Sequence, residues 1–391
     1  MTKYDVIVAG AGAMGMSAGY FLAKEGKKVL MIDAFDPPHT SGSHHGDTRI
    51  MRHANGEGIQ YVPLALRSQE IWNYLQAQTN DPIFMKTGVI SFGLPDSKFV
   101  DHALEGAQKY NIEHEYFEDG PSFHDRWADL QFEDKIHGVY EPHAGILFPE
   151  NIIRTFKRLA LDEGAELKVH EPVEEITILD QSVLIKTNKK AYTADQVIVA
   201  AGAYNNKLFA QMDLNIKLEP SRRTIGWFDA DETHYGADVF PGFFGETHHG
   251  VYYGFPSVLG TGVKIGKFYD IGNVEPEYME TVFNGYSHDE KDLRDFLNEH
   301  MPNATGNLNK GAVCMFTNTS DEDFVIDKHP QHDHVVLAAG FSGHGFKHSA
   351  AIGEILAQLA IKGESEIDIS AFSAKREALN YLFSEKGPSH F

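Results

Sequence analysis

One stretch near the N-terminus, residues 4–33, constrains the fold more than any other part of the chain. A short apolar run at 6–9 enters the motif Gly10-x-Gly12-x-x-Gly15, and a stretch with helical apolar spacing follows it. A second apolar run at 29–32 then ends on Asp33. Strand, glycine turn, helix, strand and acid in this order predict a βαβ unit that binds a dinucleotide.

Each part of this unit has a physical role in holding a dinucleotide. Gly10 allows a tight turn, Gly12 lets the backbone approach a pyrophosphate, and Gly15 lets the helix pack closely on the strand. The helix N-terminus offers N–H groups and a positive dipole end to the phosphates, and the Asp33 carboxylate can accept hydrogen bonds from ribose hydroxyls. The alternative is a purely structural glycine turn. The motif alone does not choose between FAD and NAD.

Charge and composition exclude several classes of protein. A chain of 391 residues predicts two or three domains. A net charge of −22 and a pI near 5.3 oppose binding to nucleic acid or to an anionic membrane. No run of 18 apolar residues exists, and the first strand begins too early to leave room for a signal peptide. We therefore expect a soluble cytoplasmic protein, without a metal centre and, with one cysteine, without an intramolecular disulfide.

The segment 41–58, SGSHHGDTRIMRHANGEG, is rich in glycine, serine and cationic side chains. It places positive potential close after the predicted dinucleotide unit, from His44, His45, Arg49, Arg52 and His53. One interpretation is a solvated turn. The functional interpretation is a wall of a flavin and anion site.

The remaining chain alternates between two patterns. Helices are expected at 61–75, 98–110 and 151–164, strands at 83–93, 138–148 and 167–187, and a polar connection at 111–118. A strand at 197–201 enters a turn at Gly202, either as a second unit that closes over the nucleotide fold or as an ordinary parallel strand. Period-two runs from 216 to 317 predict an antiparallel sheet, interrupted by helices at 276–286 and 289–301. A strand at 334–340, a glycine-rich turn and a helix with Lys347 in its first turn complete the pattern.

Several long strings make the chain recognisable. DAFDPPHTSGSHHGDTRIMRHANGEG, YYGFPS, KGAVCMFTNTSDEDFVID and AAGFSGHGFKHS closely resemble the monomeric sarcosine oxidase family, over essentially the whole length. The resemblance extends more weakly to N-methyltryptophan oxidase and pipecolate oxidase. It implies a two-domain α/β (α+β) fold, with a Rossmann-like FAD-binding domain of the glutathione-reductase type and an antiparallel-sheet substrate domain. We expect the first domain to comprise 1–84, 146–216 and 320–391, and the second 85–145 and 217–319.

The resemblance also implies how the cofactor is held. The family binds FAD through a thioether between the flavin 8-methyl group and a cysteine, which matches Cys314, the single cysteine of this chain. The alternative is an inert buried thiol. The expected cofactor-binding residues are Gly10, Gly12, Ala13, Met14, Gly15, Asp33, Ala34, Ser43, His44, Thr48, Arg49, Gly202, Cys314, Gly343, Gly345, Phe346 and Lys347.

Arg52 and Lys347 match the two cations that grip the substrate carboxylate in the family, where charge-assisted hydrogen bonds orient a small amino acid. Lys264 matches the lysine implicated in oxygen activation. The resemblance places three further residues at the flavin face and in the substrate pocket, namely His45, Arg49 and Tyr253. It implies oxidative demethylation of sarcosine or a related secondary amino acid by O2, giving glycine or another primary amine, formaldehyde and hydrogen peroxide, by a monomer.

Three residues depart from the family pattern. Phe244, Phe268 and Phe316 stand where the family has Met, His and Tyr, all bordering the substrate. The changes leave a more apolar, aromatic pocket and favour a bulkier or cyclic secondary amino acid, such as N-methyltryptophan, N-methylalanine, pipecolate or proline. Two alternatives remain open: an amine dehydrogenase with another electron acceptor, and a flavin-binding protein without enzymatic activity.

Overall fold

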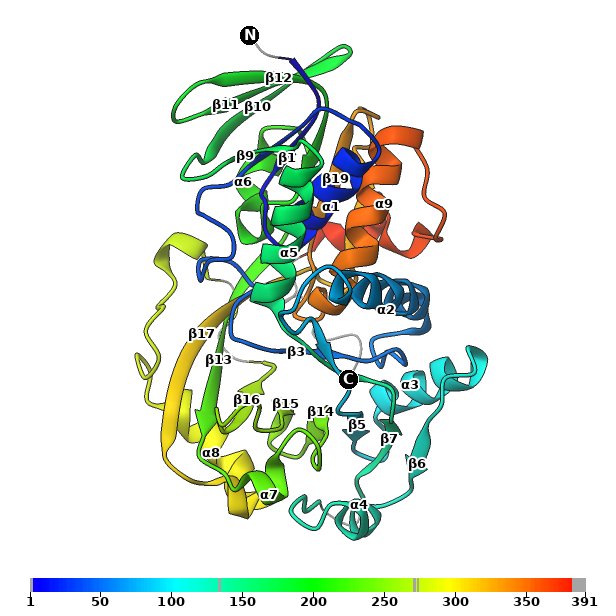
Figure 1. Cartoon of the computed structure of the whole chain (residues 1–391), viewed down its shortest axis with the longest axis vertical. Coiled ribbons are helices and arrows are strands. Elements are labelled where there is room, and N and C mark those ends of the chain that lie inside the picture. The colour runs from blue at the N-terminus through cyan, green and yellow to red at the C-terminus, as the bar shows by residue number, and fades with distance from the viewer. Residues whose placement is uncertain (1–2, 133–134, 270–271, 273, 382–391) are drawn as a thin grey trace.

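The computed structural model describes residues 3–132, 135–269, 272 and 274–381. Within these residues, two eight-stranded sheets lie at opposite ends of the molecule, and a three-stranded sheet lies between them (Figure 1). Helices α1, α2, α5 and α9 gather beside the first sheet, and α3, α4, α7 and α8 lie around the second (Figure 1). This arrangement agrees with the predicted two-part α/β fold.

The first sheet is built on parallel strands. Its order is β10-β11-β12-β1-β2-β9, with β19 also paired to β12, and β18 to β19. The pairs of β1 with β2, β1 with β12, and β12 with β19 are parallel and almost fully buried, as a sheet covered on both faces requires. The strands are β1 (Lys3–Ala9), β2 (Val29–Ile32), β9 (Glu166–Lys168), β10 (Val173–Leu179), β11 (Ser182–Thr187), β12 (Ala191–Val199), β18 (Val325–Lys328) and β19 (Val335–Ala339).

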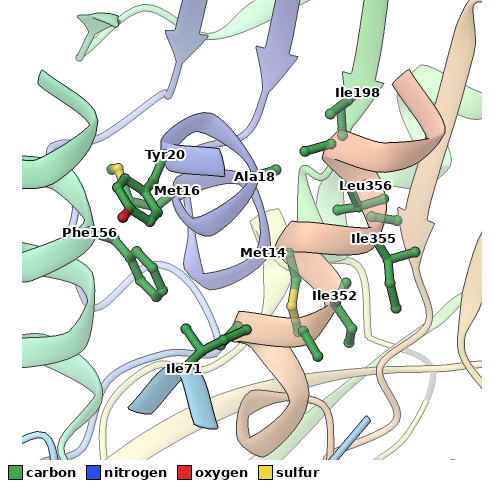
Figure 2. Close-up of a cluster of buried hydrophobic side chains, with 14 of the residues drawn as sticks. Met14, Met16, Ala18, Tyr20, Ile71, Phe156, Ile198, Ile352, Ile355 and Leu356 are labelled. Carbon is green, nitrogen blue, oxygen red and sulfur yellow. The ribbon is translucent and has the colours of Figure 1, made fainter. Parts of the chain in front are cut away.

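Helix α1 (Ala13–Lys24) is the centre of the core of this half. It packs between α5 (Pro149–Asp162) and α9 (Ser349–Lys362), with Met14 and Ala18 turned toward the isoleucines of α9 (Figure 2). A Cβ on Gly353 would lie 2.1 Å from Ser17 Oγ, so glycine is required for the close approach of α9 to α1. Helix α2 (Val62–Gln76) packs on α9 as well.

The second sheet has the order β17-β13-β16-β15-β14-β5-β7-β6. It is antiparallel, as predicted, except that β5 and β14 pair in parallel. This exception arises because β5 and β14 belong to segments more than a hundred residues apart in sequence, so no hairpin turn sets their direction. The strands are β5 (Val89–Gly93), β6 (Glu115–Phe117), β7 (His137–Glu141), β13 (Glu219–Phe228), β14 (Gly242–Thr247), β15 (Gly250–Phe255), β16 (Val263–Lys267) and β17 (Leu308–Asn318).

Short elements connect the two halves. The small sheet has the order β3-β8-β4, formed by β3 (Arg49–Met51), β4 (Phe84–Met85) and β8 (Gly145–Leu147). The remaining α-helices are α3 (Lys98–Lys109), α4 (Gly120–Arg126), α6 (Asn205–Ala210), α7 (Glu232–Tyr235) and α8 (His288–His300). The 3-10 turns are η1 (Ile59–Tyr61), η2 (Gly202–Tyr204), η3 (Pro276–Tyr278), η4 (Pro302–Ala304), η5 (Phe346–His348), η6 (Ser370–Phe372) and η7 (Glu377–Asn380).

Three local predictions are wrong. The expected polar connection at 111–118 contains β6, which pairs with β7. The expected helix at 276–286 is reduced to η3, because the carbonyls of Glu280 and Val282 accept hydrogen bonds from the Arg222 side chain instead of continuing a helix. Lys347 lies in η5, just before α9, and not in the first turn of that helix.

The two large sheets draw on separate parts of the chain. Strands of the first lie within 3–32, 166–199 and 325–339, and strands of the second within 89–141 and 219–318. The domain boundaries given above stay a prediction, and the end of the 320–391 segment from residue 382 on lies outside the described residues. In the described part of the chain, no helix is long and apolar enough to cross a membrane.

A buried ion pair is expected to dominate the stability of the second half. Arg222 on β13 donates two hydrogen bonds of 2.7 Å to Asp289 on α8, and both side chains are at most 1% exposed. Asp289→Ala leaves the guanidinium charge buried without its carboxylate, so the free energy of unfolding should fall by about 3–5 kcal/mol in urea titrations. Asp295→Ala, which breaks the exposed pair with Lys291 on the same helix, is the control and should change little. Equal effects of the two substitutions would contradict this prediction.

Candidate active site

The glycine-rich turn after β1 opens into a cavity of about 590 Å³. Gly10 has φ +95°, and a Cβ there would lie 2.5 Å from the Ala200 carbonyl oxygen. A Cβ on Gly15 would lie 1.8 Å from the Gly10 oxygen, so α1 reaches the strand only because this residue is glycine. Residues at the carboxyl ends of β1, β2, β12 and β19 line the cavity, which is the edge where parallel α/β sheets bind ligands.

The N-terminus of α1 meets this cavity without a capping side chain. The N-cap is Gly12, which makes no side-chain cap hydrogen bond, and the first turn carries no acidic residue. Peptide N–H groups and the positive end of the helix dipole therefore face the cavity and favour an anionic group. His44 lies close to this turn, and burial lowers the pKa of its imidazole to about 3, so the ring is neutral.

Asp33 holds the glycine turn in place. One oxygen, Oδ2, accepts a hydrogen bond of 2.8 Å from Ala11 N, and Oδ1 accepts one of 2.9 Å from Phe35 N. The carboxylate also borders the cavity. Its predicted contact with ribose hydroxyls stays a prediction, and the structure adds a role in loop geometry that the sequence pattern does not show.

Most of the predicted cofactor residues line the cavity together. Those that do are Gly10, Gly12, Ala13, Met14, Asp33, Ala34, Ser43, His44, Arg49, Gly202, Gly343, Gly345 and Phe346. Those that do not are Gly15, Thr48, Cys314 and Lys347. A cavity of this size, with an uncapped helix end and glycines where side chains would collide, fits a dinucleotide.

Cys314 lies on β17 beside this cavity, which its neighbour Met315 lines. The thiol is 2% exposed, and its sulfur lies 4.0 Å from Arg49 Nη2. Burial by itself raises the pKa of Cys314, but His45, Arg49 and Lys264 outweigh that effect and lower the pKa to about 7. A substantial fraction of this thiol is therefore thiolate, the reactive form, near neutral pH.

Two cationic side chains, the buried Lys264 and the half-buried Arg49, order the loop that precedes β3. Lys264 Nζ, from β16, donates hydrogen bonds to the carbonyl oxygens of Gly46 (2.6 Å) and Thr48 (2.8 Å). Arg49 Nη2 donates to the carbonyl oxygens of Ser43 (2.8 Å) and His45 (2.5 Å). Burial, and then the charge of Arg49, holds the pKa of Lys264 well below its ordinary value. The alternative interpretation of this segment as a solvated turn does not hold, because His44, His45 and Thr48 are buried.

A second group of charges is buried next to the loop. Arg52 Nη2 lies 2.5 Å from Glu57 Oε1, and Lys347 Nζ lies 3.4 Å from the same oxygen. All three side chains are at most 4% exposed. The Arg52 guanidinium carbon lies 4.6 Å from the ring centroids of both Phe99 and Phe244, which contact each other with centroids 4.8 Å apart. Arg52 and Lys347, distant in sequence, thus converge on one carboxylate oxygen.

An aromatic wall extends from this charged group toward the cavity. The rings of Phe244 and Phe268 are 5.1 Å apart, and those of Phe268 and Phe316 are 5.5 Å apart. A Cβ on Gly343 would lie 2.4 Å from the Phe316 ring, so the glycine turn packs directly on the wall. Tyr253 joins the same cluster, and burial raises the pKa of its hydroxyl, which stays protonated.

Glu57 is the site residue that sequence reasoning missed. It is one of two carboxylates, with Asp47, in the cationic segment 41–58, so the sequence alone does not single it out. Among the residues that the structure describes, no group of three or more histidine, cysteine, aspartate or glutamate side chains could hold a metal ion.

The family model of the FAD-dependent oxidoreductases (DAO) matches residues 5–359. The chain belongs to the FAD-dependent oxidoreductase family. The predicted cofactor FAD is therefore confirmed.

This oxidoreductase is 50% identical over 381 residues to "Monomeric sarcosine oxidase" from Bacillus sp. (strain NS-129), with 97% of this chain and 98% of the relative covered. It is 36% identical to "N-methyl-L-tryptophan oxidase" from Salmonella heidelberg (strain SL476), covering 96% of this chain and 99% of the relative. The predicted resemblance to the monomeric sarcosine oxidase family is thereby confirmed. In fold, it matches L-proline dehydrogenase from P. horikoshii with a TM-score of 0.84 and 21% identity, over 97% of this chain and 99% of the other.

Proposed function

We propose that this oxidoreductase oxidatively demethylates sarcosine or a related secondary amino acid. One molecule each of secondary amine, O2 and water gives one each of primary amine, formaldehyde and hydrogen peroxide. The observation that carries the proposal is the convergence of Arg52 and Lys347, both buried, at one end of an aromatic wall whose other end meets the FAD cavity. Such a pair suits the carboxylate of a small amino acid. The similarity to a monomeric sarcosine oxidase and to an N-methyl-L-tryptophan oxidase supports the same reaction.

Bound FAD would supply the two-electron redox chemistry between the amine and O2. We propose that Cys314 holds it by a thioether, because the single thiol lies beside the cavity and its cations favour the thiolate. Ser43 steadies this strand by donating a hydrogen bond of 2.5 Å to the Met315 carbonyl oxygen.

The other side chains orient and polarise. Lys264 would present a buried cation where O2 gains charge, and Arg49 would fix the loop at the flavin face through its carbonyl contacts. His45 adds positive potential beside Cys314, and Thr48 supports Lys264. No side chain need abstract the amine proton, because this positive surrounding favours a neutral amine over an ammonium group.

A larger substrate is a second candidate, favoured by the wall of Phe244, Phe268 and Phe316. Three phenyl rings without an imidazole or phenol offer a surface for an apolar side chain or ring. N-methyltryptophan, N-methylalanine, pipecolate and proline should then exceed sarcosine in kcat/KM. We expect the enzyme to act as a monomer in the cytoplasm.

A substrate panel with peroxide detection tests the function directly. Sarcosine and the four larger compounds should be compared for bleaching of the flavin colour and for peroxide formed under air. Bleaching with stoichiometric peroxide supports the oxidase. Bleaching without peroxide would indicate a dehydrogenase with another acceptor, and a yellow protein that no compound bleaches would indicate a binding protein.

Arg52→Ala should raise KM for the best substrate by roughly 10²-fold, because one charge-assisted contact contributes about 1.5–3 kcal/mol and the buried Glu57 loses its partner. Steady-state kinetics give this ratio. Arg49→Lys, in the loop at the flavin face, is the comparison. It preserves a positive charge at a position outside the Arg52–Lys347 pair and should change KM far less. An unchanged KM in Arg52→Ala would remove Arg52 from the substrate site.

A further inference from the structure

Glu57 is a buried carboxylate shared by the two cations proposed to bind the substrate carboxylate. Its Oε1 lies 2.5 Å from Arg52 Nη2 and 3.4 Å from Lys347 Nζ, and the side chain is 3% exposed. Its Oε2 is buried without a hydrogen-bond partner among the described residues. A carboxylate that is desolvated and only half satisfied is costly, so its retention between two cations calls for an electrostatic explanation.

The environment of Lys347 gives that explanation. Burial lowers the pKa of its ammonium group to about 7; Glu57 opposes this change, and Arg52 adds to it by repulsion. Burial raises the pKa of Glu57, yet Arg52 and Lys347 hold it well below its ordinary value, so the carboxylate stays charged. Without Glu57, two like charges would share a dry site, and the lysine is the one able to lose its proton.

Other ionisable groups around Lys347 cannot replace Glu57. His344 Nδ1 lies 3.8 Å from Glu57 Oε1, and burial keeps the pKa of His348 well below its ordinary value, so that ring is neutral. Glu141 on β7 acts only as a weaker favourable charge and pairs with His53. The groups that face Lys347 from the surrounding elements are Arg52, Glu57, Glu141, His344 and His348.

We propose that Glu57 is a positioning residue that keeps Lys347 charged and Arg52 in place, and thereby sets the upper pH limit for carboxylate binding. This inference rests on the proposed function, since it assumes that Arg52 and Lys347 receive a carboxylate. It adds a residue that does not touch the reacting atoms and that acts through its two neighbours.

The test measures binding of acetate to the holoenzyme from the change in flavin absorbance, between pH 5 and pH 9, without turnover. The wild type should bind acetate with an affinity that falls as pH rises through the pKa of Lys347. In Glu57→Gln the pH at which acetate affinity falls should be lower by roughly one to three units, the size of shift that a neighbouring charge produces. Acetate binding at pH 8 should weaken by about tenfold or more, and the difference should close toward pH 5.

Two further variants separate charge from shape. Lys347→Arg replaces the lysine by a group that keeps its proton. Adding Glu57→Gln to this variant should therefore not shift the pH dependence of acetate affinity. Glu57→Asp, which keeps the negative charge, should bind acetate at alkaline pH better than Glu57→Gln does. The inference is overturned if Glu57→Gln leaves the pH at which acetate affinity falls unchanged. It is also overturned if Glu57→Gln shifts that pH equally in the Lys347→Arg background. A wild type that binds no acetate at any pH overturns the proposed carboxylate site, and the inference with it. Flavin absorbance and unfolding midpoint show that each variant is folded.

Discussion

Cys314→Ala is expected to convert covalent flavin into flavin that leaves the protein completely on denaturation. Acid-precipitated wild type should stay yellow, and the same precipitate of the variant should be colourless with the flavin in the supernatant. The physical reason is that Cys314 is the single thiol of the chain and lies against the cavity wall at Met315. Absorbance of the two fractions measures the effect.

The single cysteine also makes the control simple. A thiol reagent should find no free thiol in unfolded wild-type holoenzyme and one in apoprotein produced without a supply of flavin. Attachment of flavin to this apoprotein should speed up about tenfold per pH unit below the thiol pKa of about 7, and level off above it, because the thiolate is the nucleophile. A wild-type precipitate without colour would refute the thioether.

Lys264→Met is expected to slow the reaction of the reduced enzyme with O2 by roughly 10²–10³-fold, the effect of removing one preorganised charge at a developing anion. The rate of flavin reduction by substrate should change by much less, because Lys264 Nζ contacts the loop carbonyls of Gly46 and Thr48. It does not belong to the Arg52–Lys347 pair proposed to bind the substrate carboxylate. Stopped-flow absorbance separates the two half-reactions.

Lys267→Met is the matched control on the same strand, since its ammonium group pairs with Asp292 at the surface of the second sheet. It should leave both half-reactions near their wild-type rates. If Lys264→Met slows reduction and reoxidation by the same factor, Lys264 supports the loop in general and is not an oxygen site.

The sequence predicts those parts of the molecule that depend on local pattern. Residues 4–33 form the expected βαβ unit, because glycine spacing and apolar runs act over short distances. The helix expected at 276–286 fails because its carbonyls bind Arg222, a contact that no local pattern records. The prediction of an antiparallel sheet fails at the parallel pair of β5 and β14 for the same reason. This pair joins segments that only the tertiary fold brings together.

The candidate site divides in the same way. Residue types such as Cys314, Arg52 and Lys347 are predictable from long strings shared with a family, and the structure brings them close to the cavity. Glu57 is not predictable, because its importance arises from two cations that converge from residues 52 and 347. Its burial between them, and not its sequence neighbours, determines its charge.

The discontinuity of the first sheet limits when the flavin pocket can form during synthesis. Its wall needs β1 from the start of the chain and the turn after β19, at 340–346, from near its end. A growing polypeptide whose turn has not yet emerged has the thiol but no enclosed pocket, so the attachment proposed above can follow only nearly complete translation. Ribosome-bound chains ending at residue 330 should therefore carry no flavin, whereas full-length chains acquire it.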